Sequence, residues 1–205
     1  KERMKNFPIV SIAPSFESIF DTFTFDSYQG GALAAQAFLE EGYKKFGIIR
    51  GPLDKWEAAL RRNGFRDTIE NAGFNIIWDY KGNYSFDLSP DGERLVILNS
   101  EFAPYTRIYT LDIASTKLNQ TAKLPYLMRS VTWHHDNQTI VHPSPHPAYE
   151  LWQSNLAGDT IAVVASNTSR VKHVSRVNNG QDFTFVSYLL NRDVFYQHAK
   201  DTVDK

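Results

Sequence analysis

The stretch Ser89–Val96, SPDGERLV, decides the fold of the second half of the chain. Asp91-Gly92 predicts a tight turn, because glycine reaches backbone angles that such turns require. The apolar run Leu95–Leu98 follows the turn, and TRIYTLDI (106–113) then alternates as a second strand. Since Leu95 to Leu98 are all apolar, both faces of their strand are apolar. We therefore expect this strand to be central in its sheet and buried on both sides.

The same pattern returns twice further along the chain. HHDNQTIV (134–141) places Asp136-Asn137 at the turn, and VNNGQDFTFV (177–186) places Asn179-Gly180 there. A period of about 43 to 45 residues with four short strands each is the spacing of propeller blades. We expect residues 83–197 to be almost wholly antiparallel β, with no helix longer than two turns. Strands near FTFVSY (183–188) are expected at a sheet edge.

The SPDG turn, its apolar strand and IYTLDI resemble TolB-like β-propeller repeats, and the resemblance weakens through the second and third copies. Two to three blades cannot close a ring that usually needs four to eight. The resemblance therefore implies a partial propeller with exposed apolar faces and unpaired edges. We expect a homo-oligomer that forms through these exposed strand edges.

The first 79 residues show a different order of apolar segments. Buried strands are predicted at FPIVSI (7–12), KKFGIIRG (44–51) and FNIIWD (74–79), and a short strand at FTFD (23–26). Two helices are predicted, about 29–41 and 55–72, with Asp54 as a possible N-cap and with Gly42 and Gly73 at their ends. One face of the first helix would carry Ala32, Ala35, Phe38 and Leu39. This alternation predicts an α/β layer with parallel strands.

FPIVSI, FTFDSYQGGALAAQAFLEEGYKKFGIIRGP and RRNGFRDTIENAGFNI, taken in this order, resemble the effector-binding core of LacI-family transcription regulators. The resemblance implies that residues 1–79 are a partial effector-binding α/β segment, part of a two-lobed periplasmic-binding-like fold. It also implies that Asp26 and Arg61 face the effector cleft, where a carboxylate and a guanidinium can bind hydroxyl or carboxylate groups. Two plainer interpretations stay open: Asp26 caps the following helix, and Arg61 is a solvated base like Arg62 and Arg66.

Residues 80–205 would then be the partial propeller, joined near Tyr80–Tyr84, and the chain is a mosaic. The chain begins at Lys1 without an initiator methionine, and we interpret it as a fragment or an excised domain. A natural fusion, an artificial chimera and a truncated protein remain open. We predict a non-enzymatic module of a bacterial transcription regulator that senses a sugar-like effector. Two alternatives are a propeller-like protein-interaction module and a chimera without an evolved function.

Composition narrows the remaining classes. The net charge of −1 gives no general attraction to nucleic acid or anionic membranes, and no cysteine is present for disulfides or thiolate chemistry. No phosphate loop, H-E-x-x-H or G-x-S-x-G motif occurs, and no DNA-reading element is recognisable. His134, His135, His142 and His146 are interpreted as turn or surface histidines. We expect no catalysis, cofactor, metal or membrane span, and a cytoplasmic location.

Overall fold

A computed structural model describes residues 10–12, 21–81, 85–100, 105–145, 150–166, 170–177, 182–189 and 192–198. The chain divides into two compact units, Lys1–Lys81 and Gly82–Lys205. We call the first the helical unit and the second the sheet unit. Each is described separately below.

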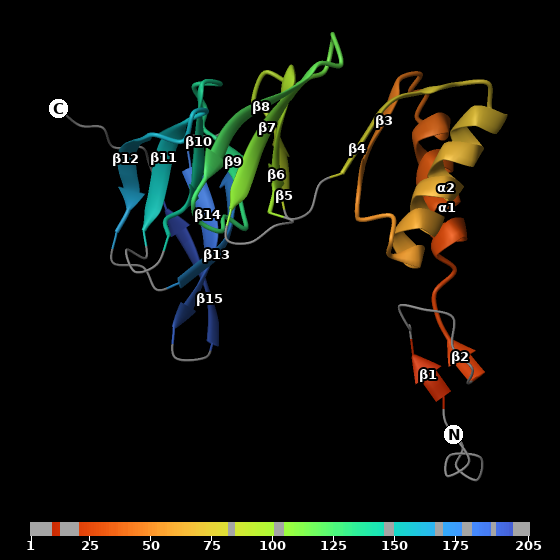
Figure 1. Ribbon diagram of the computed structural model, residues 1–205, viewed down its shortest axis with the longest axis horizontal. Coiled ribbons are helices and arrows are strands. Elements are labelled where there is room, and N and C mark those ends of the chain that lie inside the picture. The colour runs from red at the N-terminus through yellow and green to blue at the C-terminus, as the bar shows by residue number, and fades with distance from the viewer. Residues whose placement is uncertain are drawn as a thin grey trace. The chain divides into compact units, whose positions relative to one another are not determined.

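The helical unit alternates strands and helices along the chain (Figure 1). Its elements are β1 (Val10–Ile12), β2 (Asp21–Phe23), α1 (Ser27–Glu40), β3 (Phe46–Arg50), α2 (Trp56–Asn71) and β4 (Ile76–Lys81). Strand β1 pairs with β2 and β3 pairs with β4, and both pairs are parallel. Helices α1 and α2 pack along one another beside the β3–β4 pair (Figure 1). The predicted α/β alternation with parallel pairing is therefore present as two separate two-stranded sheets.

Local sequence explains where the two helices begin and end. The Asp26 carboxylate accepts a hydrogen bond from the backbone N–H of Gln29 at 2.8 Å, so Asp26 is the N-cap of α1. Gly42 and Gly73, at φ of 80° and 85°, follow the two helices in the left-handed region, as predicted. The prediction of Asp54 as N-cap of α2 is wrong, because that position is Lys55, which makes no side-chain capping bond.

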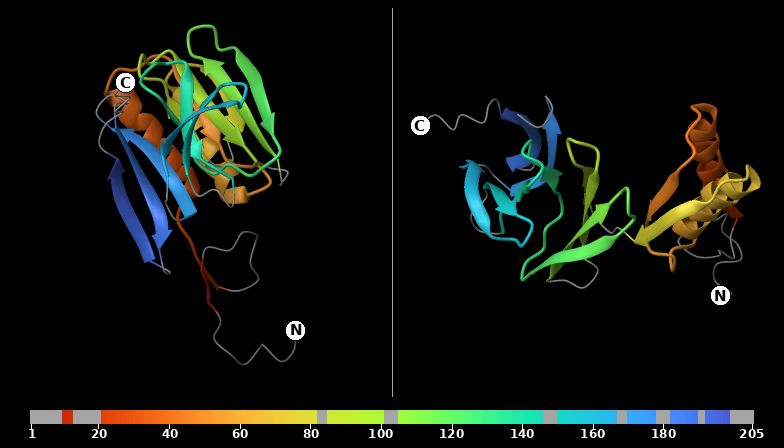
Figure 2. Two further views of the ribbon diagram at one scale, coloured as in Figure 1. Left: turned by 90° about the vertical axis from the view of Figure 1, so that its left-hand side faces the viewer. Right: turned by 90° about the horizontal axis from the view of Figure 1, so that it is seen from above.

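The sheet unit consists of antiparallel strands throughout its described residues. The first sheet has the order β5 (Ser85–Leu88), β6 (Arg94–Asn99), β7 (Thr106–Asp112) and β8 (Leu118–Leu124). The second has the order β9 (Thr132–Trp133), β10 (Thr139–Pro143), β11 (Leu151–Asn155) and β12 (Thr160–Ala165), and the third β13 (Arg170–Val177), β14 (Asp182–Leu189) and β15 (Arg192–His198). Strands β5, β9 and β13 lie next to one another, so the sheets follow in sequence order (Figure 2).

The turns before β6 and β10 have the predicted chemistry. Gly92 has φ of 76° and Asn137 has φ of 56°, so both occupy the left-handed region that the turn requires. In the first turn the Asp91 carboxylate accepts from the Ser89 hydroxyl at 2.5 Å and from the Glu93 N–H at 3.0 Å. These hydrogen bonds lower the pKa of Asp91. The third predicted turn, Asn179-Gly180, lies outside the described residues.

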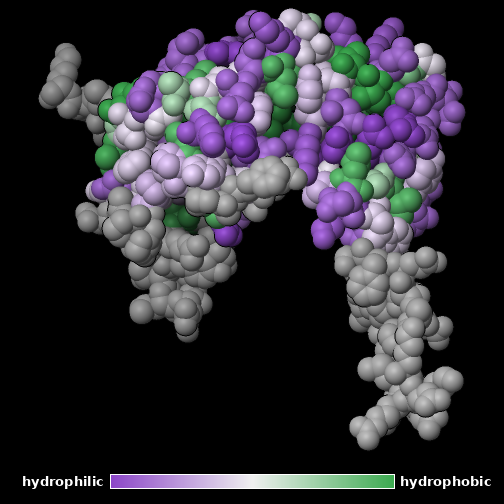
Figure 3. Space-filling view, in the orientation of Figure 1, coloured by the Kyte–Doolittle hydropathy of each residue, from purple (hydrophilic) through white to green (hydrophobic). Residues whose placement is uncertain are grey.

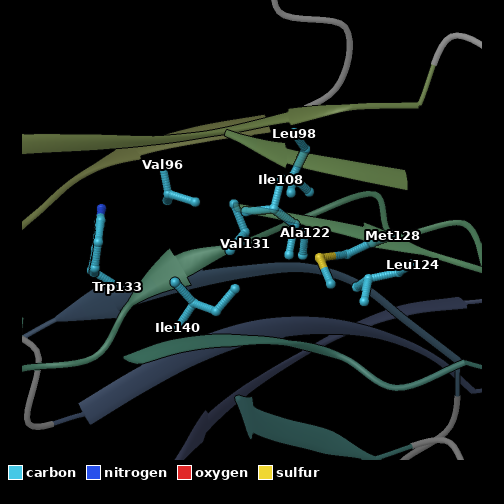
Figure 4. Close-up of a cluster of buried hydrophobic side chains, with 9 residues drawn as sticks. All are labelled: Val96, Leu98, Ile108, Ala122, Leu124, Met128, Val131, Trp133 and Ile140. Carbon is cyan, nitrogen blue, oxygen red and sulfur yellow. The ribbon is translucent and has the colours of Figure 1, made fainter. Parts of the chain in front are cut away.

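Hydrophobic cores form between successive sheets and beneath the helices. The core between the first and second sheets contains the nine side chains labelled in Figure 4, and Trp133 is its largest fully buried member. A second core joins the second and third sheets through Val141, Leu151, Val174, Phe183 and Phe185. In the helical unit Ala35, Phe46 and Ile69 are buried together. The predicted strand Leu95–Leu98 is β6, which is inner in its sheet and buried on both faces.

The prediction of an edge position for FTFVSY is wrong, because it falls in β14, the central strand of its sheet, which pairs on both sides. On the predicted apolar face of α1, Ala32 and Ala35 are buried, whereas Phe38 is 48% exposed and packs edge-to-face against Phe65 of α2. Hydrophobic residues also reach the surface elsewhere in both units (Figure 3).

Candidate functional site

A pocket of about 350 Å³ lies between α1, β3 and α2 in the helical unit. Its lining combines small residues, apolar side chains and arginines. The lining residues are Gly30, Gly31, Ala34, Phe38, Gly47, Ile48, Ile49, Arg50, Gly51, Ala58, Arg61, Arg62 and Phe65. An apolar cleft with a few polar groups is the usual form of a small-molecule site.

Glycines in the two helices allow the backbones that frame this pocket to approach closely. A Cβ on Gly31 would lie 2.0 Å from the Arg61 carbonyl oxygen, and a Cβ on Gly64 would lie 1.9 Å from the Tyr28 carbonyl oxygen. No side chain fits at either position without moving the opposite helix. Gly31 and Gly64 therefore fix the separation of α1 and α2 and, with it, the place of Arg61 beside the first turns of α1.

One carboxylate holds two of the three arginines at the pocket. Asp79, near the end of β4, binds Arg50 of β3 through Oδ1 at 2.7 Å and Arg62 of α2 through Oδ2 at 2.6 Å. Arg50 ends β3, and Asp79 lies two residues before the end of the parallel strand β4, so the two side chains meet near the carboxyl ends of these strands. This network was missed at the sequence level, although a base and an acid at the ends of two predicted parallel strands were its signal.

Arg61 is exposed and forms no ion pair with any residue that the structure describes. It also lines a second, adjoining hollow of about 270 Å³ together with Lys55, Trp56 and Glu57. Its guanidinium is consequently available to a ligand, whereas those of Arg50 and Arg62 are committed to Asp79. A free guanidinium can donate two parallel hydrogen bonds to a carboxylate, or donate to hydroxyl oxygens.

Asp26 has a structural task at the start of α1, through the cap to Gln29. It is not among the residues that line the pocket, whereas Gly30 and Gly31 of the same helix are. Of the two residues predicted to face the cleft, the structure thus places Arg61 at the pocket and Asp26 at the helix cap.

The sheet unit has a polar groove of about 340 Å³ along its three adjacent strands β5, β9 and β13. Two charged side chains lie there, and Arg176 Nε is 3.5 Å from Asp87 Oδ2. Asp87 also accepts hydrogen bonds from the Thr132 hydroxyl at 2.7 Å and the Trp133 N–H at 2.8 Å. These groups satisfy one another across the sheets, so the groove is a weaker candidate than the pocket beside Arg61.

The interpretation of the histidines as turn or surface groups is wrong for His142, which is buried within strand β10. His134 is also buried, but it opens the Asp136-Asn137 turn, where its carbonyl accepts from the Asn137 N–H at 3.3 Å. His142 Nδ1 lies 2.9 Å from the Pro143 carbonyl, which can only accept, so Nδ1 carries the proton and Nε2 accepts from the Ser154 hydroxyl at 2.9 Å. Burial lowers the pKa of His142 to about 4, so the ring is neutral at physiological pH.

His135 is exposed, and His146 lies outside the described residues. Within the part of the chain that the structure describes, no three His, Cys, Asp or Glu side chains are grouped closely enough to hold a metal ion. Neither α1 nor α2, the helices of the described residues, is long and apolar enough to cross a membrane.

Comparison with known proteins supports a partial resemblance to repressors. The ribose operon repressor of Escherichia coli (strain K12) is 34% identical over 104 residues, which are 47% of this chain and 31% of the repressor. The HTH-type transcriptional repressor PurR of Haemophilus influenzae (strain PittEE) is 44% identical over 50 residues, 24% of this chain and 15% of that protein. The predicted resemblance to LacI-type repressors is thereby confirmed for part of the chain. The chain spans less than a third of the length of these curated relatives.

Among solved structures, TolB from Acinetobacter baumannii is 14% identical with a TM-score of 0.39, and the match covers 62% of this chain and 35% of that one. No protein-family model matches the chain. The repressor match and the repeated antiparallel sheets are in line with the predicted mosaic of two kinds of segment.

Proposed function

We propose that the helical unit is a non-enzymatic sensing module of a bacterial transcription regulator and that it binds a small sugar-like effector in the pocket beside Arg61. The observation that carries this proposal is the difference among the three arginines at the pocket. Asp79 neutralises Arg50 and Arg62, and Arg61 stays exposed at the junction of two hollows. A ligand that carries hydroxyl or carboxylate groups would supply the hydrogen-bond acceptors that Arg61 lacks among the described residues.

Binding without catalysis is also what the side chains at this pocket favour. Asp79, the carboxylate bound to two of the lining arginines, accepts from their guanidinium groups at 2.6–2.7 Å. Two such partners occupy both of its oxygens and leave it poorly placed to accept a proton from a ligand. The residues that line the pocket are glycine, apolar or arginine, so it offers groups for recognition and none for nucleophilic attack.

The relative named as a ribose operon repressor directs the choice of ligand to pentoses first. Isothermal titration calorimetry of the 205-residue chain against ribose, other pentoses, hexoses and purines tests the proposal. We expect one class to release heat, and we expect Arg61→Ala to weaken that binding by about ten-fold or more, because a hydrogen bond to a charged group contributes roughly 1.5–3 kcal/mol.

Arg66→Ala is the matched control. Arg66 lies on the same helix, is bound to Asp67 at 2.7 Å and is not among the lining residues, so its removal should leave the affinity unchanged. Absence of heat with every ligand would overturn the proposal. Equal affinity of the Arg61→Ala variant and the unsubstituted chain would overturn the role of Arg61.

A further inference from the structure

The three adjacent strands of the sheet unit carry one four-residue pattern in register. It reads Ser-Phe-Asp-Leu at 85–88, Ser-Val-Thr-Trp at 130–133 and His-Val-Ser-Arg at 173–176. Polar residues occupy its first and third positions, and the second is always apolar. Because neighbouring residues of a strand point to opposite faces, the two sets of side chains face opposite neighbours.

The first and third positions point toward the following sheet. The Ser85 hydroxyl accepts from the Val131 N–H at 3.3 Å, and the Ser130 hydroxyl accepts from the Val174 N–H at 2.9 Å. Two residues further along, the Thr132 hydroxyl donates to Asp87 at 2.7 Å and accepts from the Arg176 N–H at 3.3 Å. The contact between the first and second sheets is thus repeated between the second and third.

The second and fourth positions point toward the preceding sheet. Val131 and Trp133 are buried at 2% and 0% exposure because the first sheet covers them. Their counterparts in the first sheet are Phe86 and Leu88, which are 57% and 41% exposed. This sheet has an apolar face that matches the buried faces of its successors, yet both side chains remain in solvent.

The third sheet instead exposes polar side chains, on its opposite face. His173 and Ser175 occupy the positions of Ser85 and Asp87, and both are exposed. Among the described sheets, the first therefore exposes an apolar face of the kind that its successors bury against a preceding sheet. The third exposes polar side chains at the positions that bind a following sheet in its predecessors.

We propose that a second copy of this chain covers Phe86 and Leu88 with the His173–Arg176 strand of its third sheet. The contact continues the two sheet–sheet interfaces already present within one chain. Since it joins different faces, a two-fold axis produces it twice, and two chains of three sheets close into a ring of six. Six lies within the range of four to eight sheets in which such rings close. The contact lies on the sheet face, not at the strand edges where the sequence placed it, and does not depend on the proposed effector.

Sedimentation velocity of the 205-residue chain at tens of micromolar tests this ring. We expect a dimer, and we expect Phe86→Lys to be monomeric because a buried, unpaired ammonium is costly. Ile161→Lys is the matched control, since Ile161 is also 57% exposed but lies on the outer strand β12. It should remain dimeric. A monomeric unsubstituted chain would overturn the ring, and so would a dimer that is lost in Ile161→Lys and kept in Phe86→Lys.

Complementation distinguishes the head-to-tail ring from any other dimer. Ser175→Lys alone should also be monomeric, because both of its interfaces would carry the added bulk. When it is mixed with Phe86→Lys at high concentration, one interface contains neither substitution, and a mixed dimer should appear. Mixing that leaves both variants monomeric would contradict the ring. Circular dichroism of each variant confirms that loss of the dimer is not loss of the fold.

Discussion

The two units achieve close packing by opposite means. In the helical unit the backbones of α1 and α2 approach because Gly31 and Gly64 have no side chain at the crossing. In the sheet unit neighbouring sheets are joined by polar side chains, such as Ser85 and Ser130, that bind the backbone of the next sheet. The first contact tolerates no added atom, whereas the second depends on particular hydroxyl and carboxylate groups. Substitutions should therefore destabilise the two units for different reasons: added atoms in the helical unit, and lost hydroxyl or carboxylate groups in the sheet unit.

The largest effect is expected in the core of the sheet unit. Trp133→Ala removes a fully buried indole that also donates from Nε1 to the Asp87 carbonyl at 3.1 Å. We expect a loss of about 3–5 kcal/mol in the free energy of unfolding, measured by urea denaturation. Trp152→Ala is the control, because Trp152 is only half-buried, and its loss should be clearly smaller. Equal losses would mean that the core between the first and second sheets does not dominate the stability of the sheet unit.

A pH-dependent effect on the order of 3 kcal/mol is expected from His142, whose folded pKa of about 4 lies below the ordinary histidine value of 6.5. The neutral ring is the form that the fold accommodates. Its contribution is complete above pH 6.5 and is lost as the pH falls from 6.5 toward 4. Urea denaturation at pH 7.5 and 5 should show this decrease in the unsubstituted chain. In His142→Gln, which cannot titrate, the free energy of unfolding should decrease less between pH 7.5 and pH 5. An equal decrease in the variant and in the unsubstituted chain would contradict the burial of a neutral imidazole.

Adjacent glycines provide a sharp test of the helix crossing. Gly31→Ala places a methyl group 2.0 Å from the Arg61 carbonyl, and we expect a loss of roughly 1–3 kcal/mol in the thermal stability of the helical unit. Gly30→Ala meets nothing within 4 Å and should stabilise α1 by about 0.5–1 kcal/mol, because alanine loses less conformational freedom in a helix. Calorimetric melting of both variants checks the opposite signs. If both substitutions changed the thermal stability in the same direction, the helix crossing would be able to relax around the added methyl group.

The smallest effect is expected at the start of α1. Asp26→Ala removes the cap to Gln29 and should lower the stability by about 1 kcal/mol, while Asp26→Ser keeps a capping oxygen and should lower it much less. If Asp26 also contacts an effector, both substitutions should weaken binding by a similar factor. Thermal melting and calorimetric titration of the same two variants separate these roles.

Much of this arrangement could be predicted from local sequence. The helices, the left-handed turns at Gly92 and Asn137 and the buried strand Leu95–Leu98 each follow from a short pattern of apolar spacing and turn residues. The central place of β14 could not be predicted, because its position depends on a pairing with β15 that the sequence pattern of either strand does not specify. The repeat itself could be recognised in the sequence. Its alternating polar and apolar contacts could not, because they depend on how the three strands β5, β9 and β13 are aligned with one another.

The candidate site was predictable only in part. Arg61 was identified through a family resemblance, and its availability depends on Asp79, a residue 18 positions away in sequence that occupies Arg50 and Arg62 instead. Which arginines pair with Asp79 depends on how the folded unit brings the side chains together, so it could not be predicted from the sequence. The burial of His142 was missed for a similar reason, because proline neighbours suggested a surface turn, while the ring lies buried within β10 and binds Ser154 of the neighbouring strand β11.

The most direct test of the central claim asks which unit binds the effector. Two-dimensional ¹⁵N–¹H spectra of the 205-residue chain, recorded during titration with the ligand that calorimetry selects, report each backbone amide separately. We predict shifts at the pocket amides of Gly30, Gly31, Gly47 and Gly51 and none at those of Val131 and Val174 in the groove of the sheet unit. Shifts confined to Val131, Val174 and their neighbours, with the glycine amides of the helical unit unmoved, would contradict the account.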